Sequence, residues 1–158
     1  MIRRIFLFLL SCCVIVTINA QSYNQEKTAL TNFLMRLYEN APFEGVKAVE
    51  DYDNAYLMSV VKLDKSKYPS ESALNRVASV KAMSQASRFF NGSNVTSDMI
   101  IRTTDKSDGT SDTEIIENIK ENSAGYVKQL EQLVNFQDKN ANQVFIFIAP
   151  LKKQKGAR

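Results

Sequence analysis

An apolar stripe at helical spacing runs through residues 22–40. Polar side chains lie opposite it, so the pattern predicts an amphipathic helix whose apolar positions are Tyr23, Leu30, Phe33, Leu34, Leu37 and Tyr38. Asn40-Ala41-Pro42 ends this helix, because the residue before a proline is pushed out of helical geometry. We expect the stripe to pack on the protein's own core, and the alternative is a helix that docks on a partner.

Two strands are predicted after the first helix. Residues 46–50 alternate between apolar and polar side chains, which is typical of a strand with one buried face. Residues 51–54 have the composition of a turn. Residues 55–63 are apolar at both odd and even positions, as in a strand that is buried on both faces of a sheet. The two strands and their turn predict a hairpin.

The clearest helix covers residues 70–91. Ser70 is a candidate N-cap, and Gly92 is a natural end because glycine accepts left-handed backbone geometry. Leu74 and Val77 precede a ridge of alanines four residues apart, and two aromatic residues close it: Ala78, Ala82, Ala86, Phe89 and Phe90. Small side chains let a helix approach a sheet closely, so we expect this helix to cross the sheet obliquely along the ridge.

The second half of the chain alternates short elements with polar segments. Residues 95–103 predict a strand with Met99 and Ile101 on one face. Residues 105–112 are rich in Asp, Ser and Thr and predict a loop, and the isoleucines of residues 114–121 favour a short helix.

Residues 126–136 fit two structures. Tyr126, Val127, Leu130, Leu133 and Val134 have helical spacing, whereas Tyr126, Leu130, Val134 and Phe136 fit one face of a strand. Residues 138–142 form a short polar turn that suits a hairpin. Residues 144–149 are β-branched and aromatic, which predicts a strand that is apolar on both faces.

Together these elements predict the α+β fold class. We expect a long alanine-ridged helix packed on a small, mainly antiparallel sheet, with an additional N-terminal amphipathic helix. Residues 21–150 are expected to form a single domain. Residues 151–158 are expected to form a basic flexible tail.

The first twenty residues have a different pattern. Two arginines precede the apolar run 5–16, and a short polar stretch then ends on Ala20. This order is typical of a secretory signal peptide, and the run is shorter than the roughly 20 apolar residues that span a bilayer. We expect cleavage between Ala20 and Gln21 and no transmembrane helix. The alternative is lipidation of Cys12, which follows Leu9-Leu10-Ser11 and would tether the protein to a membrane.

Charge argues against a nucleic-acid partner. The chain has 20 basic and 17 acidic residues, but residues 21–150 hold 14 basic residues and all 17 acidic ones. The tail carries four further basic residues, namely Lys152, Lys153, Lys155 and Arg158. Since no basic stripe is interleaved with aromatic residues, we expect no binding to nucleic acid.

The residue types exclude most catalytic mechanisms. The chain has no histidine and no tryptophan, and Cys12 and Cys13, its two cysteines, lie in the predicted signal peptide. Ser-His-Asp and Cys-His catalysis therefore lack their base, and zinc and copper lack their preferred ligands. The five glycines are scattered, so no phosphate-binding loop is present. We expect no catalytic residue, metal, disulfide or cofactor in the mature protein.

Carboxylates are the chemical groups that remain. They cluster in three places: Glu50, Asp51 and Asp53; Asp105, Asp108 and Asp112; Glu114, Glu117 and Glu121. Two carboxylates suffice for a glycoside hydrolase, but a chain without tryptophan lacks the usual platform for sugar rings. We interpret the clusters as solvated faces and turns, with no calcium site. The sequons at Asn91 and Asn94 are interpreted as a helix end and a strand start.

The order of the elements resembles a known family. The strand that ends in Val60-Val61-Lys62-Leu63-Asp64, the alanine ridge, and Ser123-Ala124-Gly125-Tyr126-Val127 before the last hairpin resemble the LPP-twenty-type lipoprotein domain and the N-terminal domain of flagellar assembly protein T. The resemblance covers about residues 55–149. It implies that residues 126–136 form a strand and that the protein belongs to a bacterial envelope. The family offers no catalytic residues to transfer, and this chain lacks a good lipobox.

The combined hypothesis is a non-enzymatic secreted or periplasmic envelope protein that acts as a protein-interaction or assembly module. Such a protein would be exported to the periplasm or outer membrane of a Gram-negative bacterium and would bind an envelope protein, not identified by the sequence, through a sheet edge or the first helix. The alternative is a carrier of a small apolar ligand, whose helix-on-sheet pocket would be lined by Tyr56, Met58, Met83, Phe89 and Met99. A carboxylate-dependent glycoside hydrolase ranks below both.

Overall fold

The computed structural model describes residues 25–51, 54–92, 99–102, 116 and 123–151. The chain divides into two compact units, Met1–Pro42 and Phe43–Arg158. The expectation of one domain between the signal peptide and the tail stays a prediction. Within the described part of the chain, the search for a helix long and apolar enough to cross a membrane finds none.

The described part of the first unit is a helix over residues 25–40. Its polar positions are exposed, and the predicted stripe is turned away from solvent, with Leu34 and Tyr38 buried and Leu30, Phe33 and Leu37 half-buried. The Ala41 N–H donates to the carbonyl of Leu37 at 3.2 Å, which completes the last turn before Pro42. The predicted amphipathic helix is confirmed over these residues.

The second unit begins with the predicted hairpin. β1 (Gly45–Asp51) and β2 (Asn54–Leu63) pair antiparallel, from Gly45 opposite Val60 to Asp51 opposite Asn54. Both odd and even positions of β2 are buried, as the apolar residues on its two faces predicted. A short 3₁₀ turn, η1 (Lys65–Lys67), follows β2.

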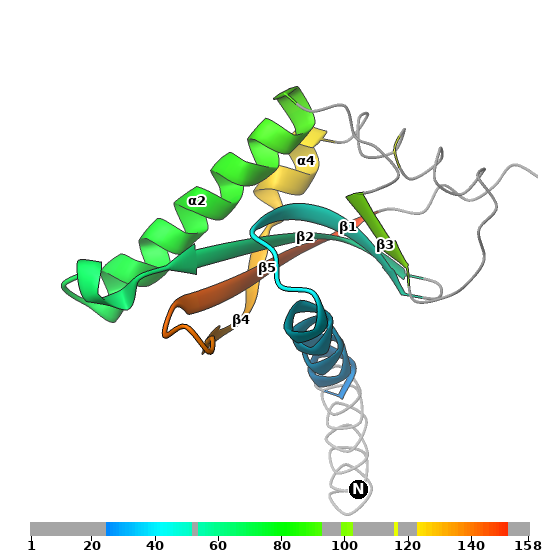
Figure 1. Cartoon of the computed structure of the whole chain (residues 1–158). Coiled ribbons are helices and arrows are strands. Elements are labelled where there is room, and N and C mark those ends of the chain that lie inside the picture. Colours follow the sequence, from blue (N-terminus) through cyan, green and yellow to red (C-terminus); the bar gives the residue numbers. More distant parts are fainter. Residues whose placement is uncertain (1–24, 52–53, 93–98, 103–115, 117–122, 152–158) are drawn as a thin grey trace, which may run out of the picture. The chain divides into compact units, whose positions relative to one another are not determined.

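The described strands form one sheet in the order β3-β1-β2-β5-β4 (Figure 1). β5 (Gln143–Leu151) lies between β2 and β4 (Glu131–Gln137) and is antiparallel to both. β3 (Ile100–Arg102) pairs parallel to β1 at one edge. The α+β class and the mainly antiparallel sheet are therefore confirmed.

One long helix covers a face of this sheet. α2 (Glu71–Gly92) crosses the strands obliquely, and its alanine ridge is fully buried against residues of β2 and β5 (Figure 1). The N-cap is the predicted one, because the Ser70 hydroxyl accepts a hydrogen bond from the Ala73 N–H at 3.2 Å. The buried cluster on this side of the sheet includes Leu57, Val61, Ala78, Ala82, Ala86, Phe145, Phe147 and Ala149.

The face of the sheet that is turned away from α2 is apolar as well. Side chains alternate across a strand, so the neighbours of the α2-facing residues project from the other face. Five of them on β1, β2 and β5 are fully buried in the chain, namely Val49, Met58, Val60, Val144 and Ile146. This accounts for the apolar runs in the two central strands.

The predicted strand over residues 95–103 is confirmed over Ile100–Arg102. Residues 95–98 and 103 lie outside the described part, and β3 begins at Ile100. Met99 precedes the strand, and it packs with Ile100 against the α2-side core, whereas Ile101 pairs with Val49. Met99 and Ile101 therefore do not share a strand face. The expected loop at 105–112 and all of 114–121 except Ile116, which is helical, lie outside the described residues.

The prediction that residues 126–136 form one strand is wrong in its first half. Residues 123–128 form a short helix, α4 (Ser123–Lys128), and the strand β4 begins only at Glu131. The helical turn buries Tyr126 next to Phe90 of α2, with ring centroids 6.3 Å apart, and it also buries Leu130. The helical spacing was the correct signal for Tyr126 and Val127 only, and the strand implied by the family resemblance holds from Glu131 to Phe136.

The last hairpin is confirmed, and one boundary changes. β4 and β5 meet at a turn in which Asp138 Oδ1 accepts hydrogen bonds from the backbone N–H groups of Asn140 and Asn142, each at 2.9 Å. β5 continues to Leu151, which is buried opposite Ala55. Leu151 therefore belongs to the sheet and not to the tail, and residues 152–158 lie outside the described part.

Candidate functional site

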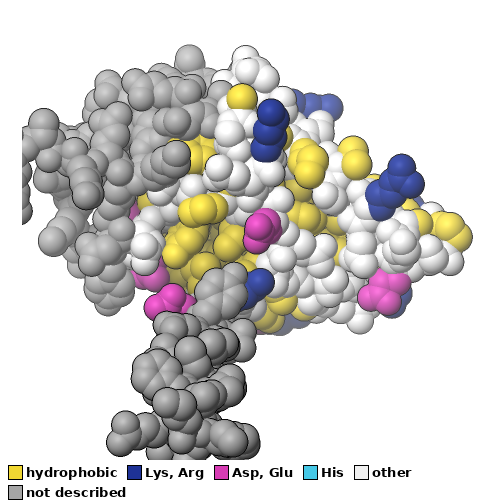
Figure 2. All heavy atoms as spheres, turned by 180° about the vertical axis from the view of Figure 1, so that it is seen from behind, with side chains coloured by type: hydrophobic (Ala, Val, Ile, Leu, Met, Phe, Trp, Pro, Cys, Tyr) yellow, Lys and Arg dark blue, Asp and Glu magenta, His cyan; other side chains and the backbone are white. Residues whose placement is uncertain are grey.

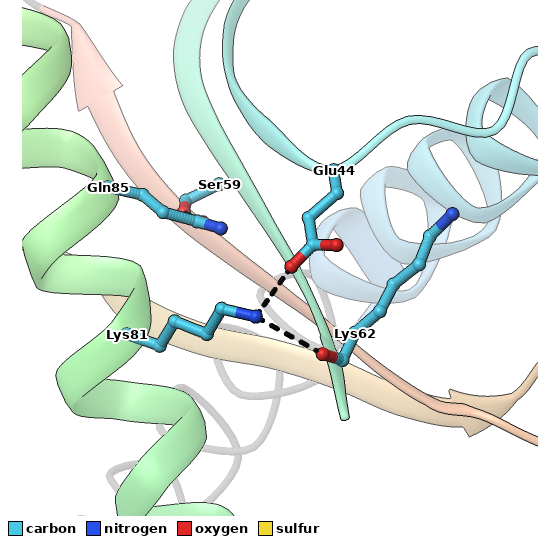
Figure 3. Close-up of polar contacts among 5 residues, drawn as sticks. All are labelled: Glu44, Ser59, Lys62, Lys81 and Gln85. Atoms are coloured by element: carbon cyan, nitrogen blue, oxygen red, sulfur yellow. Dashed lines mark hydrogen bonds and ion pairs between the residues drawn. The ribbon is translucent and has the colours of Figure 1, made fainter. Parts of the chain in front are cut away.

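A polar cluster lies between α2 and the open end of the β1–β2 hairpin. The Lys81 side chain leaves α2 toward the sheet, and its Nζ donates to Glu44 Oε1 at 2.7 Å and to the Lys62 carbonyl oxygen at 3.4 Å (Figure 3). The Lys62 side chain points away from this cluster. Both partners of the ion pair are about two-fifths exposed, since their side chains retain 40% and 39% of their surface. The pair therefore joins helix and sheet at the surface.

The second polar contact of this region is buried. Ser59 of β2 has no exposed surface, and its hydroxyl lies 3.0 Å from Oε1 of Gln85 on α2 (Figure 3). A hydroxyl without exposed surface cannot meet a substrate, and the hydrogen bond satisfies it inside the interface. The cluster around Lys81 and Ser59 is therefore a structural contact of α2 with the sheet.

The carboxylate clusters of the sequence lie mostly outside the part of the chain that the structure describes. Of the three clusters in the sequence, only Glu50 and Asp51 lie in the described part, at the end of β1. Among the described residues, no three His, Cys, Asp or Glu side chains come together as possible metal ligands. The members of the other two clusters, Asp53, and the residues of the signal peptide prediction (Cys12, Ala20 and Gln21) lie outside the described residues.

The two carboxylates whose pKa is shifted both hold turns. The pKa of Asp64 is lowered, first by the hydrogen bond from the Ser66 hydroxyl and then by the backbone N–H of the same residue. Partial desolvation acts to raise the pKa of Asp138. Hydrogen bonds from Asn142 and Asn140 outweigh that effect, so this pKa also lies below its ordinary value. Low values keep both groups ionised as caps and do not suit a general acid.

A small open cavity lies between the C-terminal part of α2 and α4. It has a volume of about 260 Å³, and its wall is mainly apolar. The lining residues come from only these two helices: Ser87, Phe90, Asn91, Ala124, Val127 and Lys128. The cavity is thus at the margin of the helix layer, whereas the interface between α2 and the sheet is closed by the buried alanine ridge.

The predicted lining of a helix-on-sheet pocket is not assembled. Met58 is buried on the sheet face away from α2, and Phe89 is buried in the α2-side core. Met99 packs on that core from outside, Tyr56 shares the face of Met58, and Met83 is exposed on α2. These five side chains point in three directions, so they cannot enclose one ligand.

The outer face of α2 carries an apolar stripe that the sequence analysis did not single out. Val77, Val80 and Met83 retain 37%, 63% and 39% of their surface, and they follow one another at three-residue intervals. Successive positions of this spacing lie within one broad side of a helix. Val77 was expected to lead into the buried ridge, but it faces outward. The spacing of these three residues was the available signal.

Two arginines flank this stripe. Arg76 and Arg88 are exposed, and no Asp or Glu occurs between residues 72 and 92. On the face of the molecule drawn in Figure 2, Lys and Arg side chains lie apart from one another with hydrophobic side chains between them. The described surface in that view mixes hydrophobic, basic and acidic side chains, without the dense basic patch that nucleic acid requires.

Comparison of the chain with protein-family models, with curated proteins and with solved structures finds no match.

Proposed function

We propose that this chain is a non-enzymatic, exported protein of the bacterial cell envelope that binds another protein. The observation that carries the proposal is the apolar stripe of Val77, Val80 and Met83, hereafter the outer stripe, on the solvent side of α2. These side chains take no part in the packing of α2 on the sheet, because the alanine ridge already fills that interface. Clustered exposed apolar side chains with a polar rim are typical of a protein-binding surface.

The export part of the proposal rests on the sequence. A basic start, an apolar run and a small residue at Ala20 support secretion, and the absence of His supports a role without the common catalytic bases. The sheet edge at β4 is a weaker docking site. Its exposed positions are polar, and a register shift between Gln132 and Val134 marks a bulge, which discourages the pairing of a further strand.

The experiment that tests the proposal is site-specific photo-crosslinking in cells that produce the full chain. A photoreactive residue at Ser84 lies next to the outer stripe without replacing it, and the same residue at Lys139 in the β4–β5 turn is the control. We expect a protein adduct from position 84 and a much weaker one from position 139. An absence of any adduct from position 84 would refute the proposal.

A second candidate function, a carrier of a small apolar ligand, is favoured by the cavity between α2 and α4. Its volume of about 260 Å³ is slightly below the usual range of ligand pockets, roughly 300–1,000 Å³. Binding of the apolar dye 8-anilinonaphthalene-1-sulfonate, followed by its fluorescence, tests this function. Ala124→Phe would fill the cavity, and the control Ser84→Phe adds the same ring to the outer face of α2. The carrier function requires that Ala124→Phe abolishes dye binding and that Ser84→Phe does not.

A further inference from the structure

We infer that the outer stripe of α2 is built to receive an acidic amphipathic helix of a partner protein. This inference rests on the proposed function and names the chemistry of the partner. It is carried by the charge and the side-chain sizes around Val77, Val80 and Met83.

The charges that flank the stripe have one sign. Arg76 and Arg88 are exposed on the outer part of α2, and Glu71 in the first turn is the single acid of the helix. Lys81, the remaining cation of α2, is paired with Glu44 at 2.7 Å. The outer face of α2 therefore presents apolar side chains beside two arginines. A complementary partner surface would present apolar side chains beside carboxylates.

The spacing of the arginines defines the partner further. Arg76 and Arg88 are twelve positions apart, which is about 18 Å along an α-helix at 1.5 Å per residue and about 120° around it at 3.6 residues per turn. A partner helix that crosses α2 obliquely would therefore meet both arginines with carboxylates at the two ends of the contact. Arginine binds carboxylate with a planar pair of donors, so each contact also fixes the register of the two helices.

Small residues favour a helix as the occupant. Ala73 lies seven residues before Val80, and Ser84 lies seven residues after Val77, so both small residues are on the side of α2 that includes the outer stripe. Small side chains at a contact let two helix axes come close to the lower end of the usual 8–10 Å range. Membrane-binding helices usually present Leu, Phe or Trp, and the exposed apolar residues here are two valines and a methionine. A second copy of α2 would bring its own two exposed arginines and, as its one acid, Glu71 in the first turn.

The test uses the full chain with the photoreactive residue at Ser84 and three variants of it. Arg76→Glu with Arg88→Glu reverses the flanking charge, Val80→Asp removes the centre of the stripe, and Lys139→Glu changes an exposed charge elsewhere. We expect the first two variants to lower the adduct yield at least tenfold and the third to leave it unchanged. The yield should also fall as salt rises, because exposed charges are screened. The adduct peptide should carry Asp or Glu beside an apolar helical stripe.

The outcomes separate this inference from the proposed function. A protein adduct that survives the double arginine reversal would overturn the acidic partner and leave the protein-binding function standing. An adduct to lipid, or to a second copy of this chain, would also overturn it. If the chain without these substitutions gives no adduct at position 84, both the acidic partner and the protein-binding function are refuted. Circular dichroism of each variant guards against loss of yield through unfolding.

Discussion

The ammonium group of Lys81 lies 2.7 Å from the carboxylate of Glu44 and so joins the middle of α2 to the residue before β1. Lys81 also donates to the carbonyl oxygen of Lys62 at the end of β2. The Lys81 side chain thus contacts both strands of the hairpin at its open end, opposite the turn (Figure 3). The long side chain of Lys81 makes this contact possible, because it extends from the helix to the end of the hairpin.

Breaking the Lys81–Glu44 pair is expected to cost little stability. Both side chains are about two-fifths exposed, and ion pairs of that kind contribute roughly 0–1 kcal/mol. A double-mutant cycle with Lys81→Met and Glu44→Gln, measured by urea unfolding, should give a coupling energy in that range. The value should shrink in 0.5 M salt. A coupling of several kcal/mol would show that the pair is shielded from solvent.

The pKa of Asp64 should lie below its ordinary value of about 3.9. The Ser66 hydroxyl donates to Asp64 Oδ1 at 2.7 Å, and this bond favours the ionised carboxylate. Since the folded pKa is depressed, the stabilisation is present above the unfolded pKa and is lost as pH falls through the folded pKa. Carboxyl NMR titration measures this directly. Ser66→Ala should move the pKa of Asp64 upward and leave that of Asp138 where it is.

Asn75→Ala should stabilise the protein. Oδ1 of Asn75 is buried and, among the described residues, has no hydrogen-bond partner. An unsatisfied buried acceptor costs about 1–3 kcal/mol, and alanine is also the better helix former. We expect the free energy of unfolding to rise by about 1 kcal/mol, because the substitution removes the unsatisfied acceptor and raises the helix propensity.

The matched control for that substitution is Ser84→Ala. Ser84 is exposed on the same helix, so its replacement reports helix propensity alone. The gain at position 75 should be the larger one. Equal gains at the two positions, or a loss at position 75, would mean that the Asn75 amide finds a partner in solution.

The sequence was informative wherever a local pattern determined burial. Alternation predicted the β1–β2 hairpin, and four-residue alanine spacing predicted which side of α2 meets the sheet. Ser70 as N-cap and the turn at residues 138–142 follow from side chains that bond to their own backbone. Such features need no knowledge of distant residues, so a single sequence suffices for them.

The sequence was misleading where a distant neighbour decides the structure. Residues 126–136 fit a helix and a strand equally, and the choice depends on α2, whose Phe90 contacts Tyr126, and on β5, which pairs only from Glu131 onward. The prediction of a ligand pocket between helix and sheet was wrong in its lining residues for a similar reason. Tyr56 and Met58 share one sheet face and Phe89 covers the other, and spacing along the chain does not specify which face a helix covers.

Val77 shows why the candidate site was missed. The residue precedes the alanine ridge by one position, and at 100° per residue one position is enough to turn a side chain out of the interface. With 37% of its surface exposed, it contributes to the outer stripe and not to the core. Which of Val77 and Ala78 is buried depends on the contact of the helix with the sheet, and that contact buries Ala78.

The mature protein should keep its stability without metal or disulfide. Both cysteines precede the predicted cleavage site at Ala20, and the described part of the chain holds no cluster of three potential ligand side chains. The thermal midpoint of residues 21–158 should therefore be unchanged, within error, by EDTA and by a reductant. Calorimetry measures it. A clear fall with the chelator would reveal a metal site outside the described residues.

The alanine ridge provides the most direct test of the fold. Ala82 is fully buried between α2 and the sheet, in a cluster with Val61 and Phe147, so Ala82→Leu would force additional methylenes into a closed interface. Such overpacking costs about 1–3 kcal/mol. Ser79 would be a poor control, because it is half-buried. Ser84 is exposed two residues beyond Ala82, so Ser84→Leu adds the same side chain on the outer face.

The two leucine variants should separate in urea unfolding. We expect Ala82→Leu to lower the unfolding midpoint without changing its slope, and Ser84→Leu to shift stability by no more than about 0.5 kcal/mol, as surface substitutions usually do. Equal small effects would mean that the ridge does not press on the sheet. In that case the outer stripe would no longer be the surplus apolar surface of α2, because the helix could present either side to a partner. The stability of Ala82→Leu therefore bears on the proposed binding surface as well as on the fold.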